Sequence, residues 1–135
     1  MNKNIFDFKN KTAVITGGAQ GFGLDIAKRF LDSGAKVIIW DIDTNMIEKA
    51  KKDLNSPNLT SNIVDVANYK EVESCVNEIL EKSNIDILIN NAGITGPTKT
   101  LWEYDVEMWN KIVKINLFGT FNCCKAIVPN MIKNN

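Results

Sequence analysis

Four short apolar runs alternate with stretches of helical periodicity, and this alternation constrains the fold more than any other feature of the chain. Runs of this length, bounded by polar segments, are typical of buried strands. They lie at Thr12–Thr16, Lys36–Trp40, Leu59–Val64 and Ile85–Ile89. Short connections between alternating strands and helices require parallel strands joined by right-handed crossovers. We therefore predict an α/β fold, a doubly wound parallel sheet covered by helices.

Each predicted helix carries an apolar face that should cover the sheet, and in the first helix this face begins at Phe22. The second helix should have Thr44 as its N-cap. A last helical pattern runs from about Asp105 towards Pro129. It has a second apolar side, which includes Val106, Leu117, Phe121 and Val128. Because that side exceeds what covering a sheet requires, we expect the chain expressed alone to self-associate or aggregate.

The composition excludes several classes of function. Lys and Arg number 16 and Asp and Glu also number 16, so no net charge favours a nucleic acid or an anionic membrane as a partner. The sequence has no histidine, which removes Ser-His-Asp and Cys-His catalysis and most zinc sites, and we expect no metal. Its three cysteines form no paired framework, and its first residues lack the apolar core of a signal peptide. We therefore expect a cytoplasmic protein.

A glycine-rich segment, Thr16–Gly23 (TGGAQGFG), lies between the first predicted strand and the first predicted helix. Gly17, Gly21 and Gly23 permit a tight turn, a close approach of bare backbone to a phosphate, and close packing of the helix on the sheet. The free N–H groups at the start of the helix suit an anion. A P-loop is excluded because no Lys-Ser or Lys-Thr pair follows the glycines. The segment indicates a dinucleotide site; the alternative is a flexible turn that binds nothing.

Three more motifs follow in order: Asp41 after the second predicted strand, Asp65-Val66 after the third and Asn90–Gly93 after the fourth. Together with the pattern T-G-x-x-x-G-x-G, they resemble the compact branch of the short-chain dehydrogenase/reductase family. The resemblance covers residues 1–135, but only the first half of a family member. It implies a Rossmann-type sheet of strand order 3-2-1-4, truncated after the fourth strand and its helix, which forms the dinucleotide-binding portion of a single domain.

The resemblance also implies an activity, the NAD(P)-dependent transfer of hydride between nicotinamide and a small-molecule secondary alcohol or ketone. The chain looks most like 3-oxoacyl-carrier-protein reductases and their sugar-dehydrogenase relatives, and a full-length member is expected to be a homo-oligomer, a dimer or tetramer. Family chemistry uses a Ser and a Tyr-x-x-x-Lys motif. Glu73 lies four residues after Tyr69, and Met108 four after Tyr104, so we expect the chain itself to be inactive. The alternative is a stand-alone, non-catalytic dinucleotide-binding protein, a sensor or pseudoenzyme.

Asp41 bears on the choice of cofactor. A carboxylate at the end of the second strand can accept hydrogen bonds from both hydroxyls of the adenosine ribose, and it repels a 2′-phosphate. Positions where NADP-preferring relatives usually carry a basic residue hold Gln20 and Ile42. We therefore expect NAD as the cofactor. The alternative is that Asp41 or Asp43 only caps the next helix.

The resemblance implies the remaining contacts with the cofactor. Asp65 and Val66 resemble the adenine contact, and the turn Asn90–Gly93 resembles one that stabilises the fourth strand and lies near the nicotinamide-side ribose. The candidate cofactor-binding residues are therefore Gly17, Gln20, Gly21, Phe22, Gly23, Asp41, Ile42, Asp65, Val66, Asn91, Ala92 and Gly93.

Asn116 is the candidate catalytic residue. It falls on the predicted inward stripe of the last helix, where a buried amide must find a specific hydrogen-bond partner. In the family, the Asn at this place holds a water that relays protons to the catalytic lysine. The alternative is a core Asn that satisfies a backbone group, at a helix kink near Gly119.

Overall fold

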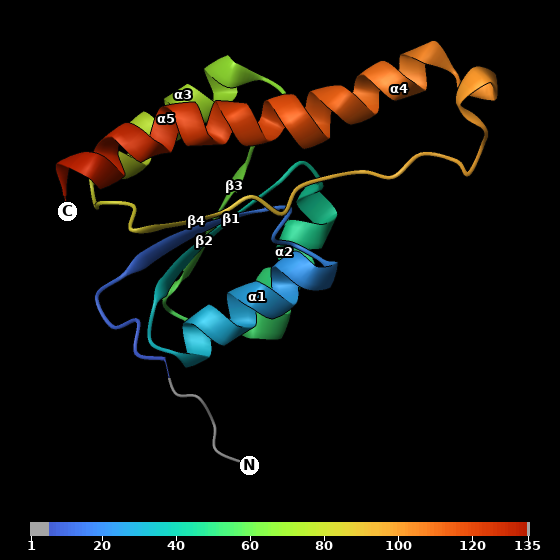
Figure 1. Ribbon diagram of the computed structural model, residues 1–135. Coiled ribbons are helices and arrows are strands. Elements are labelled where there is room, and N and C mark those ends of the chain that lie inside the picture. The colour runs from blue at the N-terminus through green and yellow to red at the C-terminus, as the bar shows by residue number, and fades with distance from the viewer. Residues whose placement is uncertain (1–5, 135) are drawn as a thin grey trace.

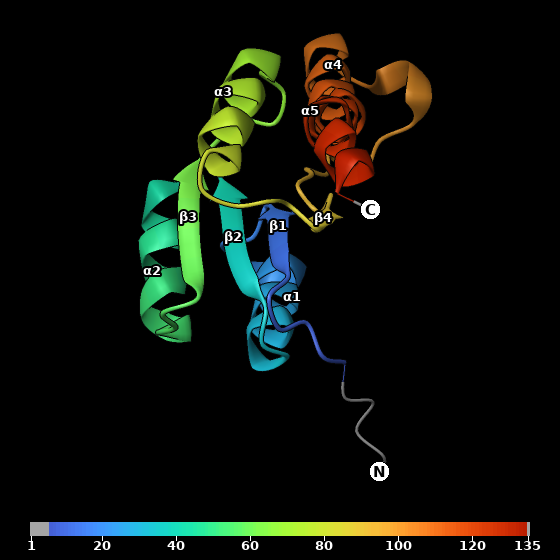
Figure 2. The ribbon, with the colours of Figure 1, turned by 90° about the vertical axis from the view of Figure 1, so that its left-hand side faces the viewer.

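The computed structural model describes residues 6–134, and its centre is a four-stranded parallel sheet that lies between two layers of helices (Figure 1). The strand order is β3-β2-β1-β4, from left to right in Figure 2. The strands are β1 (Thr12–Thr16), β2 (Lys36–Asp41), β3 (Leu59–Ile63) and β4 (Ile87–Ile89). In the register, Val14 lies opposite Ile38 of β2 and Leu88 of β4. The predicted parallel sheet and its order are confirmed.

The strand bounds differ from the prediction at three ends. β2 continues through Asp41, which pairs with Ile63, and β3 ends there, one residue before Val64. β4 is shorter than predicted and begins at Ile87. Just before it, the backbone N–H of Asp86 donates to the carbonyl oxygen of Thr12 at 2.9 Å, and the Asp86 carboxylate accepts from the backbone N–H of Thr12 at 2.8 Å and from Lys11 Nζ at 3.1 Å. Asp86 thus joins this end of the segment to β1 by both its backbone and its side chain.

Two layers of helices enclose the sheet. They are α1 (Gly21–Asp32), α2 (Thr44–Leu54), α3 (Tyr69–Leu80), a 3-10 turn (Leu101–Glu103), α4 (Val106–Val113), a π-helical segment (Lys114–Phe118) and α5 (Gly119–Lys133). Figure 2 shows α1 and α2 on one face of the sheet, and α3 with α5 on the other. None of the helices within residues 6–134 is long and apolar enough to cross a membrane.

The core consists of two apolar clusters, one on each face of the sheet. Alternate residues of the central strands point in opposite directions, so Val14 and Trp40 belong to the cluster under α3 and α5, whereas Ile15 and Ile39 belong to the cluster under α1 and α2. All four of these side chains are completely buried. Strands covered on both faces explain the unbroken apolar runs in the sequence.

Two expectations about helix starts are wrong. Phe22 does not belong to the inward face of α1: its side chain is 84% exposed, because it lies in the first turn of a helix that begins only at Gly21. The N-cap of α2 is Asp43, whose carboxylate accepts from the N–H groups of Asn45 and Met46, and Thr44 is already helical. A carboxylate at N-cap also interacts favourably with the positive end of the helix dipole.

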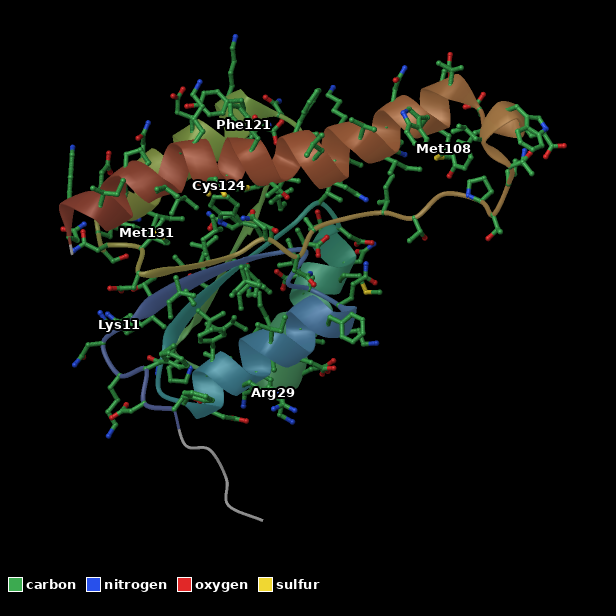
Figure 3. All side chains as sticks on the ribbon, viewed as in Figure 1. Lys11, Arg29, Met108, Phe121, Cys124 and Met131 are labelled. Atoms are coloured by element: carbon green, nitrogen blue, oxygen red, sulfur yellow. The ribbon has the colours of Figure 1, made fainter. Side chains whose placement is uncertain are left out.

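The last helix does not end near Pro129, as its sequence suggests, but continues through it to Lys133. Pro129 cannot donate a backbone hydrogen bond, which normally disfavours a helix interior. Ile127 and Met131, on either side of it, pack against the core, and this burial offsets the missing bond. In Figure 3, Met131 lies on the sheet side of α5 and Phe121 on the side away from the sheet.

The outer side of the π-helical segment and α5 is apolar and exposed, as expected from the sequence. Leu117 is 62% exposed and Phe121 is 59% exposed. At the edge of the sheet, β4 pairs only with β1 within residues 6–134. The chain therefore presents both an apolar helix face and an unpaired strand edge, two features that promote association.

We predict that the 135-residue chain self-associates at micromolar concentration. Changing Leu117 and Phe121 together to Glu should raise the monomer fraction in sedimentation, because two charges then lie on the exposed apolar face. Ile63→Glu, at an exposed apolar position of β3, is the matched control and should leave the distribution unchanged. A sharp monomer peak for the unmodified chain would contradict the prediction.

Candidate nucleotide-binding site

A cleft of about 360 Å³ lies at the carboxyl ends of the strands. Its lining residues are Gly17, Gln20, Phe22, Trp40, Asp41, Ile42, Val64, Asp65, Val66, Asn91, Ala92, Gly93, Ile94 and Ile115. The structure thus brings all four sequence motifs together, and of the candidate cofactor-binding residues only Gly21 and Gly23 do not line the cleft. From β1 the chain adds β2 and β3 on one side of the sheet and then β4 on the other, so the strand order reverses between β1 and β4. Ligands of open α/β sheets bind at such a switch point.

The glycine turn has the geometry that the sequence suggests. Gly17 and Gly21 have φ angles of +61° and +54°, which residues with side chains rarely adopt. A Cβ on Gly23 would lie 2.1 Å from the carbonyl oxygen of Gly17, so Gly23 closes the turn from behind and does not line the cleft. The side chain of Gln20, the N-cap of α1, forms no capping hydrogen bond, and no acidic residue occupies the first turn. The start of α1 therefore remains suited to an anion.

Hydrogen bonds between Thr16 and Asn91 hold the glycine turn against the end of β4. The hydroxyl of Thr16 accepts from the backbone N–H groups of Asn91 and Ala92, each at 3.0 Å. In return, the amide nitrogen of Asn91 donates to the carbonyl oxygens of Thr16 and Gly17, both at 3.0 Å. These four bonds join segments about 75 residues apart and fix the spacing between two sides of the cleft.

The carboxylate of Asp41 is 8% exposed and held by backbone. One oxygen accepts from the N–H of Ala19 at 3.2 Å, and the other from the N–H groups of Ile42 and Asp43 at 2.9 and 3.1 Å. Asp43, not Asp41, caps α2. Asp41 instead connects the end of β2 to the glycine turn, with the uncharged Gln20 and Ile42 beside it in the cleft lining.

Asp65 and Val66 form a tight turn after β3. One carboxylate oxygen of Asp65 accepts from the N–H of Ala67 at 2.9 Å, and the carbonyl oxygen of Asp65 accepts from the N–H of Asn68 at 2.9 Å. Within residues 6–134, neither the second carboxylate oxygen of Asp65 nor the N–H of Val66 has a hydrogen-bond partner. An acceptor and a donor are therefore left side by side at this end of the cleft.

Asn116 does not lie on a buried stripe, and that part of the prediction is wrong. It is exposed and lies in the π-helical segment, which interrupts the α-helical period; the buried positions that follow are Gly119, Asn122, Cys123 and Ile127. The amide of Asn116 donates to the carbonyl oxygen of Ile94 at 3.0 Å and accepts from its N–H at 2.9 Å. It satisfies both backbone polar groups of Ile94 from a helix irregularity, but as an exposed residue and not as the core Asn of the alternative interpretation, and it lies beside Gly93.

Some residues of the site carry no motif that identifies them in the sequence. Ile94 and Ile115 line the cleft outside the four motifs, and Ile115 lies in the π-helical segment, which the apolar periodicity does not predict. Thr16 is the first residue of the glycine-rich motif, but the motif does not indicate its role, which depends on the backbone amides that face its hydroxyl.

A family model described as "short chain dehydrogenase" matches residues 11–135. The chain belongs to the short-chain dehydrogenase family. It is 30% identical to 2-dehydro-3-deoxy-L-rhamnonate dehydrogenase (NAD(+)) of Sphingomonas sp., an alignment that covers 94% of this chain and 51% of that protein. It is 37% identical to a 3-oxoacyl-acyl-carrier-protein reductase of Chlamydia trachomatis, over 92% of this chain and 51% of the reductase. The chain thus spans about half the length of these relatives.

Solved structures give the same family. The 3-ketoacyl-(acyl-carrier-protein) reductase of Brucella melitensis, crystallised with NADH, superimposes with a TM-score of 0.89 at 31% identity, over 95% of this chain and 53% of that one. A serine dehydrogenase of Escherichia coli gives a TM-score of 0.85 at 31% identity, over 91% and 57%. The fold of this short-chain dehydrogenase chain is therefore the Rossmann-type nucleotide-binding fold.

The cysteines of this family member are not arranged as nucleophiles. Burial raises the pKa of Cys123 to about 12 and that of Cys75 to about 11, so both thiols are protonated at neutral pH. The sulfur of Cys124 accepts from the Asn90 side-chain amide at 3.4 Å. Within residues 6–134, no three His, Cys, Asp or Glu side chains gather closely enough to hold a metal ion.

We predict that Thr16→Val lowers the free energy of unfolding by about 2–4 kcal/mol, because two backbone N–H groups lose their acceptor in a part-buried site. Urea denaturation measures the change. Thr16→Ser keeps the hydroxyl and should cost less than half as much. Thr12→Val is the control on the same strand: Thr12 is also buried, and its hydroxyl has no hydrogen-bond partner within residues 6–134. Equal losses at the two threonines would refute the role given to Thr16.

Proposed function

We propose that this chain is the dinucleotide-binding half of an oxidoreductase that uses NAD(H) and acts on a secondary alcohol or ketone. The observation that supports this most is the convergence of the glycine turn, Asp41, the Asp65-Val66 turn and the Asn91–Gly93 segment on one cleft. The relatives are named as dehydrogenases and reductases of different substrates. The proposal is therefore limited to the reaction class and does not extend to one substrate.

The free polar groups of the cleft fit the parts of a dinucleotide in order. The start of α1, with its flexible glycines and uncapped N–H groups, suits the pyrophosphate. Asp41, already held by three N–H groups, presents its remaining lone pairs to the ribose hydroxyls without further reorganisation. The free oxygen of Asp65 and the free N–H of Val66 match the amine and the adjacent ring nitrogen of adenine.

The nicotinamide half would lie along Asn91–Gly93 and Ile94. Bound there, nicotinamide supplies the hydride acceptor or donor of the reaction. Glycine suits position 93, because a Cβ there would lie 3.2 Å from the amide oxygen of Asn116, closer than ordinary van der Waals contact, and without it the backbone is open to the ligand. Asn116 holds both polar backbone atoms of Ile94, so its side chain positions this wall of the cleft. The water-holding role proposed for Asn116 would then fall to its backbone carbonyl oxygen, which already accepts from the Thr120 hydroxyl at 3.0 Å.

We predict that the protein prefers NAD(H) to NADP(H) by about 2 kcal/mol or more, or roughly 30-fold in dissociation constant, because the Asp41 carboxylate repels a 2′-phosphate and the cleft lining formed by residues 6–134 holds no Lys or Arg to compensate. Calorimetry with both cofactors measures the ratio. Asp41→Ser should narrow the gap mainly by improving NADP(H) binding. Asp43→Ser removes a carboxylate only two residues away that caps α2 outside the cleft, and it should leave the ratio unchanged. Equal dissociation constants in the unmodified protein would exclude the NAD assignment.

We predict that residues 1–135 alone bind the cofactor but do not turn over substrate, because neither Tyr69 nor Tyr104 is followed four residues later by a lysine. A positioned general acid–base group is worth about a hundredfold or more in rate. The assay is the change in nicotinamide absorbance with a panel of secondary alcohols and ketones. Turnover above background would show that the catalytic set is different from the one proposed. Cofactor binding without turnover in every longer form of the protein would favour the non-catalytic binding protein.

A further inference from the structure

Asn122 is a buried polar residue in the apolar interior, and no motif accounts for it. It lies on α5, 7% exposed, next to the buried Cys123. Its amide nitrogen donates to the carbonyl oxygen of Val66 at 2.9 Å, across 56 positions of sequence. A buried amide at an inward position of a helix costs free energy unless it forms such a bond. The bond reaches a residue of the Asp65-Val66 turn that both lines the cleft and contacts α5.

A second contact from the same helix acts on the same residue. A Cβ on Gly119 would lie 2.7 Å from Cγ2 of Val66 and 3.2 Å from its Cβ, so α5 packs against the Val66 side chain only because position 119 is glycine. Helix α5 therefore holds Val66 at two points, its carbonyl oxygen and its side chain. Fixing both fixes the orientation of the residue, and with it the direction of its free N–H and of the preceding Asp65.

We propose that Asn122 is a positioning residue for adenine recognition. It acts through Val66: by holding the Val66 carbonyl, it aims the Val66 N–H and the free Asp65 oxygen at the edge of the adenine ring that carries the amine. This inference rests on the proposed function, because it requires adenine to lie against the Asp65-Val66 turn. A purely structural role for Asn122 would stabilise the fold without affecting which base is accepted.

Base selectivity separates the two roles. Nicotinamide hypoxanthine dinucleotide differs from NAD⁺ only in its base: a carbonyl oxygen replaces the amine, and a ring N–H replaces the neighbouring acceptor nitrogen. It therefore places acceptor against acceptor at Asp65 and donor against donor at Val66. The ratio of the two dissociation constants therefore reports on how the Asp65 oxygen and the Val66 N–H are oriented toward the base. It does not depend on the fraction of folded protein, because both dinucleotides bind the same fraction.

We predict that the unmodified protein binds NAD⁺ on the order of tenfold or more tighter than the hypoxanthine dinucleotide in calorimetry, and that Asn122→Leu reduces this ratio to about threefold or less. Gly119→Ala should lower the ratio as well, through the other contact with Val66, and alanine is a better helix former if the first variant folds poorly. Asn130→Leu is the matched control. Asn130 is also on α5 and its amide oxygen accepts from the N–H of Ile85 at 3.3 Å, but it does not line the cleft.

Each result decides between the roles. A lower ratio for Asn122→Leu and Gly119→Ala with an unchanged ratio for Asn130→Leu supports the positioning role. An unchanged ratio for Asn122→Leu and Gly119→Ala, or an equal loss for Asn130→Leu, overturns it and leaves the proposed function intact. If the unmodified protein binds both dinucleotides equally well, the turn does not read the base, and the inference also fails. If it binds neither, the proposed function fails together with the inference.

Discussion

The cleft depends on the contact between the glycine turn and the end of β4. Parallel strands bring their carboxyl ends to one edge of the sheet, but the backbone ladder ends before the loops begin, so side chains must hold the loops together. Thr16 and Asn91 do this through four hydrogen bonds that each use a backbone group as one partner. These bonds join the two sides of the cleft at the point where the strand order reverses. They therefore fix the positions of Gly17, Ala92 and Gly93 relative to one another.

The rest of the cleft is built by the same kind of connection, from side chains to distant backbone. Asp41 attaches the end of β2 to the glycine turn through Ala19, Asn116 attaches the last helix to Ile94, and Asn122 attaches it to Val66. Each of these side chains forms a hydrogen bond with a backbone N–H or carbonyl group that has no partner in a helix or strand. A part-buried loop needs such bonds, because its unpaired backbone groups would otherwise cost free energy. The groups left free afterwards, at the start of α1 and at Asp65 and Val66, are those that face the cleft.

The sequence predicts the strands, their order and most of the cleft lining. Its errors have physical causes. Phe22 has helical periodicity with the inward face of α1, but the first turn of a helix can lie beyond the sheet that the later turns cover. Pro129 usually ends a helix, yet burial of Ile127 and Met131 carries α5 past it. Asn116 leaves the expected stripe because a π-helical segment changes the period there.

The sequence alone determined those features of the protein that depend only on residues close together along the chain. The glycines of the turn, the apolar strands and the polar residues that follow them are local patterns, and a parallel sheet then brings the strand ends together. Only the tertiary structure decided the pairings across 22 to 76 positions: Thr16 with Asn91 and Ala92, Asn116 with Ile94, and Asn122 with Val66. The Thr16 pairings depend on the register between β1 and β4. The Asn116 and Asn122 pairings depend on the rotation of the last helix about its own axis, which the packing of the core and the π-helical segment set together. No local pattern encodes that rotation, because a single extra residue in a helical turn moves every later side chain to a different face.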